Sequence, residues 1–184
     1  MAQQKKTIFT TEQGVAMYPW LNKADYQFDS AGQFKVNLKM SQDNAKELVD
    51  AVKEVAKSEF GAKAANARLP FKNDPDTGDL IVVTKSKYKP KFVDSSGQLI
   101  SENNVPQIHG GSTLRLQGNI YPYVAGGQSG VSLQLSGVQI IELSEGNNNG
   151  VSFSAQEGGY LAANDNHAEA ANDNNQDGGE QYNF

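Results

Sequence analysis

The sequence predicts a mainly β fold with one α-helix, followed by an acidic C-terminal tail that does not fold. Several short stretches of residues 1–145 alternate apolar and polar side chains, as half-buried strands do. One stretch, residues 42–60, instead repeats apolar side chains at helical spacing. Residues 146–184 show almost no apolar pattern, and the 38% hydrophobic content of the whole chain is low for a fully globular protein. A chain of 184 residues therefore holds one domain, residues 1–145, and an extension.

The first part of the chain predicts strands. Residues 7–20 contain apolar and aromatic side chains broken by Gly14 and Pro19, which indicates one or two short strands. Residues 33–40 alternate without interruption and predict a strand with one buried face. The side chains expected on that buried face are Phe34, Val36, Leu38 and Met40.

The helix predicted for residues 42–60 has recognisable ends. Ser41 is a good N-cap residue, and Asp43 places a negative charge in the first turn, where the helix dipole favours it. Gly61 is a plausible stop, although the alanine-rich segment that follows could extend the helix. We expect no other helix in the chain.

The remaining strands are predicted between turn and loop sequences. We expect strands at residues 80–93, 113–124 and 131–143, with Pro90 interrupting the first of them or marking a sheet edge. The segments expected to form turns or loops are residues 73–79, 94–97, 105–112 and 125–130.

The last predicted strand carries a change of phase. Its apolar residues occupy odd positions up to Leu135 and even positions from Val138, so we expect a β-bulge or a bend at Ser136–Gly137. Five or six strands, one of them bulged, together with one helix favour a small OB-type β-barrel. A β-sandwich with a helix at one end is the alternative.

Charge is divided unevenly along the chain. Residues 1–145 contain all 16 basic residues against 15 acidic ones, a net charge of +1, whereas residues 146–184 contain six acidic and no basic residues, a net charge of −6. The overall charge of −5 therefore does not argue against a nucleic-acid ligand for the folded part. The tail is also too polar to offset its own ordering entropy, so we expect it to be disordered.

Several functional classes lack their sequence features. The chain has no cysteine, no HExxH, no P-loop and no GxSxG pattern, and its only histidines are His109 and His167. Asp74, Asp76 and Asp79 resemble part of a calcium loop, but residue 85, where the loop needs a glutamate, is lysine. We therefore predict a turn there, no enzyme activity, no metal and no cofactor.

Targeting and membrane segments are not expected either. The first residues are polar and basic without the apolar stretch of a signal peptide. No segment approaches the roughly 20 apolar residues of a membrane span. We predict no membrane partner and, with no cysteine, a cytoplasmic protein.

Four alternating lysines suggest a binding surface for a polyanion. In one extended strand Lys85, Lys87, Lys89 and Lys91 would share a face, spaced by roughly 6.6 Å, twice the strand rise. That spacing suits successive phosphates of a stretched single strand, with Tyr88 on the other face. The alternative is a solvated strand face, or an edge that lysines protect from aggregation.

Aromatic residues suggest stacking positions for bases. Tyr121 and Tyr123 share strand parity beside a glycine-rich loop, on the predicted strand that also carries Arg115. Aromatic rings bind any base because every base has a π-face. Ordinary core or rim packing is the alternative. A second group of aromatic residues is, in our interpretation, more often part of the core than a stacking surface. Its members are Tyr18, Trp20, Tyr26 and Phe28.

The acidic tail ends in DGGEQYNF, so an aromatic residue follows a run of acids. One interpretation is a solubilising extension. The other is a docking peptide whose ring enters a pocket while its carboxylates meet a basic surface. The tail could also cover the protein's own DNA-binding groove.

These features together resemble a known family, the single-stranded DNA-binding proteins of short-tailed, podovirus-type phages. The similar segments occur in order along residues 5–143 and again at the terminus. They are KKTIFT, YPWLNKADY, GQFKVNLKM, LPF, VVTKSKYKP, VDSSGQLI, VPQIHGGSTLRL, YPYV, VSLQLSGVQIIEL and the acidic end with Phe184.

The resemblance implies an OB fold and sequence-independent coating of unwound single-stranded DNA during phage replication, recombination and repair. It also implies annealing of complementary strands, a homodimer, and tail contacts to the phage DNA polymerase and primase–helicase in the cytoplasm of the infected bacterium. The alternative is a β-barrel interaction or virion module without nucleic-acid binding, and a nuclease is a third hypothesis.

The resemblance supports Tyr123 as a stacking residue, the lysines and Arg115 as backbone contacts, and Phe184 as the partner anchor. The predicted DNA-binding residues are Trp20, Lys35, Lys85, Lys87, Tyr88, Lys89, Lys91, Arg115, Tyr121 and Tyr123. The predicted partner-binding residues of the tail are Asp173, Asp177, Glu180, Tyr182 and Phe184.

Overall fold

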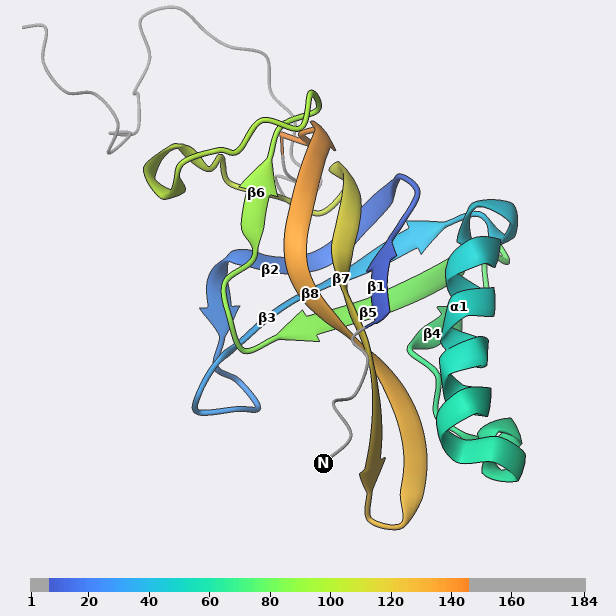
Figure 1. Cartoon of the computed structure of the whole chain (residues 1–184). Helices are drawn as coiled ribbons and strands as arrows, with labels where there is room; N and C mark the ends of the chain where they lie inside the picture. Colours follow the sequence, from blue (N-terminus) through green and yellow to red (C-terminus); the bar gives the residue numbers. More distant parts are fainter. Residues whose placement is uncertain (1–6, 146–184) are drawn as a thin grey trace, which may run out of the picture. The chain divides into compact units, whose positions relative to one another are not determined.

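A computed structural model describes residues 7–145 of the chain, so the predicted tail, residues 146–184, lies outside the described residues. The described part is mainly β with one α-helix, as predicted (Figure 1). Its strands are β1 (Thr7–Thr10), β2 (Gly14–Asp25), β3 (Gln33–Met40), β4 (Phe71–Asn73), β5 (Leu80–Ser86), β6 (Lys91–Val93), β7 (Thr113–Ala125) and β8 (Gln128–Glu142). Its helices are α1 (Gln42–Phe60) and two short 3-10 turns, Gly61–Asn66 and Glu102–Asn104.

Five strands close into a ring. The pairing runs β7–β2–β3–β5–β8 and returns from β8 to β7, while β1, β6 and β4 attach to β7, β8 and β5 respectively. Long antiparallel ladders hold β3 to β5 and β7 to β8, but the β2–β7 and β5–β8 pairings are only two residue pairs each. The architecture is therefore OB-like, as predicted, although two of its seams are too short for a complete barrel.

The helix has the predicted bounds. The Ser41 side chain accepts a hydrogen bond from the Asn44 N–H at 3.2 Å, which satisfies one of the free donors of the first turn. At the other end Gly61 adopts a positive φ of 53°, and its N–H donates to the Lys57 carbonyl. The alanine-rich continuation forms a 3-10 turn rather than more α-helix. The buried face of α1 packs against β1, β7 and β8, and consists of Ala45, Leu48, Val52 and Ala56.

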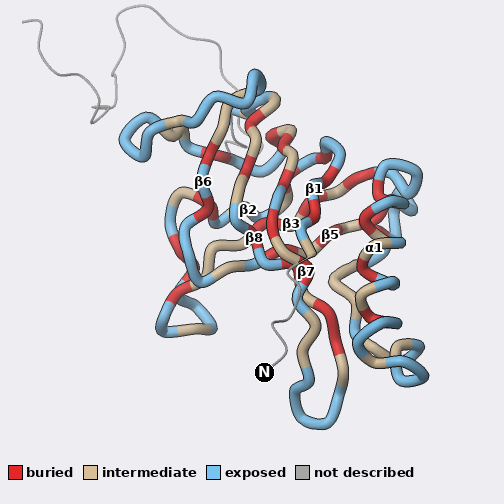
Figure 2. The backbone as a smooth tube through the Cα atoms, in the orientation of Figure 1, coloured by how far each residue is buried: buried red, intermediate tan, exposed pale blue. Residues whose placement is uncertain are grey.

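The interior of the ring is built by alternation. Even-numbered residues of β3, β5 and β7 turn inward, whereas in β8 the inward residues are odd-numbered up to Leu135 and even-numbered from Val138. This alternation gives the buried segments (red) between exposed ones in Figure 2. The predicted bulge is confirmed, because Gln117 pairs with Gly137 and Gly118 with Leu135, so Ser136 has no opposite residue. Gly118 is required there, since a Cβ would lie 1.9 Å from the Gln134 carbonyl oxygen.

The strand predicted for residues 80–93, with an interruption or a sheet edge at Pro90, is two strands in the structure. β5 ends at Ser86, whose hydroxyl accepts a hydrogen bond from the Tyr88 N–H at 3.1 Å, and β6 begins only at Lys91. Pro90 has no N–H to continue a ladder. The two strands also pair with different parts of β8: Lys85 lies beside Gln134 and Lys91 beside Gly137.

The predicted loop at residues 125–130 is much shorter than expected. Ala125 pairs with Gln128, so only Gly126 and Gly127 form the turn of the β7–β8 hairpin. Both have positive φ, 59° and 79°, which a two-residue hairpin turn of this kind requires.

The aromatic group interpreted as core is exposed. The relative exposures are 74% for Tyr18, 41% for Trp20, 59% for Tyr26 and 86% for Phe28. These residues come from the second half of β2 and the turn after it, where the strand irregularities between Met17 and Asp25 shift the alternation away from the interior. No helix among residues 7–145 is both long and apolar enough to cross a membrane.

Candidate functional site

The outer face of the β7–β8 hairpin is polar and aromatic. Since Leu114, Leu116 and Ile120 turn inward, the odd-numbered residues between them turn outward. The outward residues of β7 are Arg115, Gln117, Asn119, Tyr121 and Tyr123. Their partners on β8 are glycine, serine and glutamine residues, so the hairpin presents hydrogen-bonding groups and two tyrosines to the outside.

A line of neighbouring side chains crosses this outer face at right angles to the strands. The register pairs each member with the next one across six strands. We call it the cross-strand row, and it consists of Trp20 (β2), Lys35 (β3), Lys85 (β5), Gln134 (β8), Asn119 (β7) and Ile8 (β1). Directly paired residues of adjacent strands point to the same side, so the row is continuous on the surface.

Lys35 and Lys85 face each other in the row, and such a like-charge pair is unfavourable by itself. The structure places Asp25, only 6% exposed, in a salt bridge with the Lys35 ammonium group. The hydrogen bond from Lys35, with a second from the Gln27 N–H, holds the pKa of Asp25 below its ordinary value. Asp25 thus offsets the charge of Lys35. Lys85 forms no salt bridge with a described acidic residue, so its ammonium group is available to an anionic ligand.

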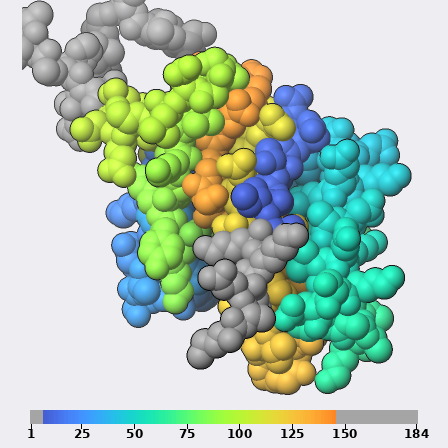
Figure 3. All heavy atoms as spheres, in the orientation of Figure 1, coloured from blue at the N-terminus to red at the C-terminus, as the bar shows by residue number. Residues whose placement is uncertain are grey.

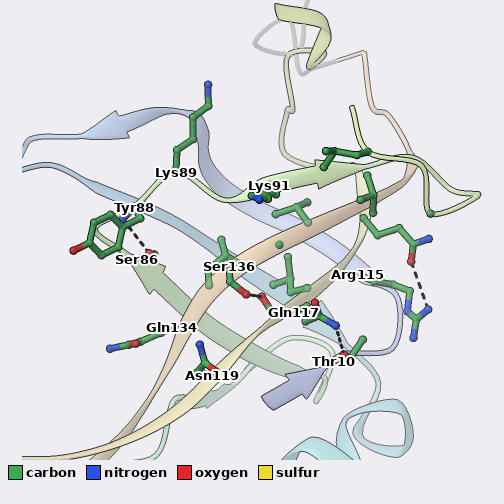
Figure 4. A pocket seen from close by; sticks show the side chains of 18 residues that line it. Thr10, Ser86, Tyr88, Lys89, Lys91, Arg115, Gln117, Asn119, Gln134 and Ser136 are labelled. Carbon is green, nitrogen blue, oxygen red and sulfur yellow. Dashed lines mark hydrogen bonds between the residues drawn. The ribbon is translucent and has the colours of Figure 1, made fainter. Parts of the chain in front are cut away.

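A groove of about 780 Å³ lies beside the row, between β6, β8 and β7 (Figure 4). Lys89, Lys91 and Arg115 contribute positive charge to it, and no aspartate or glutamate is among the described residues that line it. Its polar floor is formed by Gln117, Asn119, Gln134 and Ser136. In Figure 3 the surfaces of β6 (green), β8 (orange), β7 (yellow) and β1 (blue) lie next to one another, in the order of the sheet.

Arg115 is fixed within this groove. Its Nε donates to the Thr11 carbonyl oxygen at 3.0 Å, and one of its terminal nitrogens donates to the Gln139 side chain at 3.5 Å. The remaining guanidinium donors stay available to an anion, because an arginine carries five N–H groups. Held in this way, Arg115 loses little side-chain entropy when it binds a phosphate.

A second hollow, of about 430 Å³, opens on the other part of the outer face. It combines three cations, Arg68, Lys72 and Lys85, with the rings of Phe71 and Tyr123, and again no carboxylate of the described residues lines it. The Tyr123 ring lies directly over Gly130, where a Cβ would come within 2.5 Å of it. Both hollows therefore offer positive charge and aromatic or amide surface without competing acids.

The structure brings most of the predicted DNA-binding residues onto one face, although not as the expected lysine stripe. Trp20, Lys35 and Lys85 belong to the cross-strand row, and Tyr123 lies with Lys85 in the second hollow. Tyr121 turns outward from β7 with 43% of its surface exposed.

The other predicted lysines follow the break in the strand. Tyr88, Lys89 and Lys91 line the larger groove together with Arg115. Lys87 lies in the connection between β5 and β6, close enough to Asp29 for its charge to contribute to the lowered pKa of that carboxyl, after the stronger effects of hydrogen bonds from Ala31 and Gln33.

Sequence reasoning missed Arg68, Phe71 and Lys72. They lie on or beside the three-residue strand β4, and Arg68 reaches the hairpin through an isolated bridge to Gly130. So short a strand has no periodicity to detect. The alternating amides Gln117 and Asn119 carried no separate signal, since polar side chains at outward positions are also typical of any strand with one solvated face.

Two other predictions concern metals and the tail. Asp74 pairs with Lys39 at 2.7 Å and accepts hydrogen bonds from the N–H groups of its own turn, so the segment is the predicted turn. Among residues 7–145 no cluster of potential ligands suits a metal ion.

The predicted partner-binding residues of the tail lie outside the described residues: Asp173, Asp177, Glu180, Tyr182 and Phe184.

Comparison with known proteins identifies relatives of one kind. No family model matches the chain. The chain is 31% identical to the single-stranded DNA-binding protein of Enterobacteria phage T3, in an alignment that covers 89% of each. Its fold is similar to gp2.5, a single-stranded DNA-binding protein encoded by bacteriophage T7, with a TM-score of 0.66 and 26% identity over 86% of this chain and 100% of that one. The single-stranded DNA-binding protein of bacteriophage Enc34, solved in complex with single-stranded DNA, shares the fold at a TM-score of 0.61 and 18% identity, over 75% of this chain and 88% of that one.

Proposed function

The chain belongs to the family of phage single-stranded DNA-binding proteins, and from that premise we propose that its outer face binds single-stranded DNA without sequence preference. The family consists of binding proteins rather than enzymes. The observation that carries the proposal is the arrangement of cations along the cross-strand row and in the two hollows beside it: no described carboxylate lines either hollow, and in the row Asp25 offsets Lys35 but not Lys85.

Each part of the outer face suits one part of a single strand. Lys85, Lys91 and Arg115 offer charge to phosphates, which provide the salt-dependent part of the affinity. Tyr121 and Tyr123 offer rings to bases, and stacking accepts any base. A duplex hides the faces of its bases, so the same surface prefers an unpaired strand.

We further propose how this binding serves the phage. Residues 1–145 coat unwound strands during DNA replication and recombination in the cytoplasm of the infected bacterium. The bases rest on rings and amides rather than in closed base-specific pockets, which leaves them ready to anneal with a complementary strand.

The tail, residues 146–184, is proposed to contact the phage DNA polymerase and primase–helicase, with Phe184 as the anchor, and the protein to act as a homodimer. The six acids and terminal aromatic residue support this role.

Deleting residues 164–184 should leave the thermal unfolding midpoint unchanged and tighten DNA binding, because a competing anion is removed. Phe184→Ala should weaken capture of the polymerase without altering DNA affinity. Sedimentation equilibrium measures the dimer directly.

The binding proposal is tested by fluorescence anisotropy of labelled dT oligomers, duplex DNA and RNA at several salt concentrations. We expect the tightest binding to unpaired DNA and a slope of log K against log salt of about −0.7 for each phosphate contact. A preference for duplex, or an affinity that does not change with salt, would contradict the proposal. No binding to any oligonucleotide would favour a protein-interaction or virion module instead.

A further inference from the structure

The geometry points to Phe28 as a base-stacking residue that extends the DNA-binding surface past the cross-strand row, an inference that rests on the proposed function. Phe28 lies in the turn of residues 26–32 between β2 and β3. Its 86% exposure is the greatest among the large hydrophobic side chains of the described residues. Removing so exposed an aromatic ring from water is favourable, so a ligand that covers the ring binds more tightly.

The ring stands next to the row. The Lys35 ammonium nitrogen lies 5.9 Å from the centroid of the Phe28 ring, within the range of a cation–π contact. Lys35 is also the direct cross-strand partner of Trp20, which is 41% exposed. At the β2–β3 end of the row, one exposed ring therefore lies near the Lys35 ammonium group, and the cross-strand neighbour of Lys35 carries a second.

The turn holds this arrangement without a ligand. The Asp29 carboxylate accepts hydrogen bonds from the Ala31 N–H at 2.9 Å and from the Gln33 side chain at 3.1 Å. Gly32 has a φ of 77°, and the Tyr26 ring packs so closely on it that a Cβ would lie 2.6 Å away. Phe28 is thus presented by a turn whose shape is fixed by its own contacts, which lowers the entropy cost of stacking.

Charge decides between a nucleic acid and an apolar protein as the occupant. The rings lie among Lys35, Lys85 and Lys87, the last of which is close to Asp29. An apolar protein surface would bury Lys85 without a partner and would also take the Lys35–Asp25 pair out of water, at a large desolvation cost. A single strand instead brings phosphates for the lysines and bases for the rings, so the occupant we infer is single-stranded DNA.

The path of the chain also supports an extension at this end. β3 begins where β5 ends, since Phe34 pairs with Ser86, so the turn of residues 26–32 and the connection carrying Tyr88 lie at the same end of the ring (Figure 1). Tyr88 is 82% exposed. A single-stranded DNA that continues past the row toward β2 and β3 therefore meets the turn of residues 26–32, which carries Phe28.

The experiment compares variants of Phe28 in the full-length chain by anisotropy on two ligands, a dT oligomer and an oligomer of the same length without bases. We expect Phe28→Ala to weaken binding of dT about fivefold or more, Phe28→Leu to do the same, and Phe28→Trp to restore the affinity. With the base-free oligomer all four proteins should bind equally. Leu143→Ala, which removes an exposed apolar side chain beyond the end of β8, is the matched control and should change neither affinity.

A second readout uses Trp20, the only tryptophan in the chain. Quenching of its fluorescence by dT reports stacking beside Lys35, and the quenching should require bases in the ligand. Equal thermal unfolding midpoints for the wild type and Phe28→Ala would show that the turn stays folded.

The outcomes separate the two proposals. Wild-type protein that ignores dT in low salt would defeat the proposed function and this inference together. Wild-type protein that binds dT while Phe28→Ala or Phe28→Leu binds equally well would overturn the inference alone. A loss of affinity by Phe28→Ala that persists on the base-free oligomer would overturn it too, because the ring would then act on something other than bases.

Discussion

Lys85 offers the sharpest test of how the outer face binds a single strand. It is exposed at the middle of the cross-strand row, and no acidic side chain of the described residues forms a salt bridge with it. Its neighbour Lys35 is already paired with Asp25. Lys85→Ala therefore removes one free charge from the surface and little else.

The size of the effect follows from counterion release. Each phosphate contact to a single strand contributes about 0.7 to the slope of log K against log salt. Losing one contact should weaken binding about fivefold at roughly 0.1 M salt, near 1 kcal/mol, and the difference should vanish as salt approaches about 1 M. Stability should change by less than about 0.5 kcal/mol, because the side chain is exposed and its removal relieves repulsion with Lys35.

The assay is anisotropy of a labelled dT oligomer at four or more salt concentrations, with Lys53→Ala on the exposed side of α1 as the matched control. The control should keep the wild-type slope. A loss of affinity that is the same at every salt concentration, or a control that loses as much, would refute the account of Lys85 as a phosphate contact.

Three further expectations concern stacking, packing and pH. Tyr123→Ala should weaken dT binding by about 1–3 kcal/mol at every salt concentration, because it removes a ring and no charge; a change in salt slope would argue against stacking. Gly118→Ala should destabilise the fold by about 1–3 kcal/mol or more, since its Cβ would meet a backbone carbonyl oxygen at 1.9 Å, whereas Gly137→Ala, with no atom closer than 3.8 Å, should be tolerated in chemical denaturation. The salt bridge with Lys39 lowers the pKa of Asp74 from 3.8 to about 2, so its carboxylate stabilises the fold above about pH 4 and this stabilisation is lost between about pH 4 and 2. Asp74→Asn should flatten the fall of the thermal unfolding midpoint over that interval, and an unchanged profile would count against the pairing.

Local patterns predicted the elements whose determinants are local. The helix and β3 were predicted with their observed bounds, because a side-chain cap, a terminal glycine and strict alternation each act within a few residues. The bulge at Ser136 was predicted for the same reason, since a change of phase in the apolar pattern is visible in the strand itself.

The break between β5 and β6 depends on a distant strand. Pro90 predicts an interruption within residues 80–93, but the length of the break follows from β8, which pairs with Lys85 at Gln134 and with Lys91 at Gly137. Because the four lysines do not lie on one continuous strand, the predicted lysine stripe does not form. Lys89 and Lys91 nevertheless line the groove beside the row that carries Lys85, because both segments pair with β8.

The cross-strand row is a property of register, which no single stretch of sequence contains. Lys35 lies 15 residues after Trp20 and 50 residues before Lys85 in the chain, and the three become neighbours only when three strands align. The aromatic residues near Phe28 were interpreted as core because large rings are usually buried, and the irregular end of β2 gave no clear alternation to correct that interpretation.

Photocrosslinking shows whether a single strand lies across the outer face of the ring. A dT oligomer carrying 5-bromodeoxyuridine is irradiated in complex with the full-length protein, and the crosslinked peptides are identified by mass spectrometry. We expect crosslinks to rings of the outer face, at Trp20, Tyr88, Tyr121 or Tyr123. Crosslinks confined to α1 and the 3-10 turn that follows it would show that the DNA binds elsewhere.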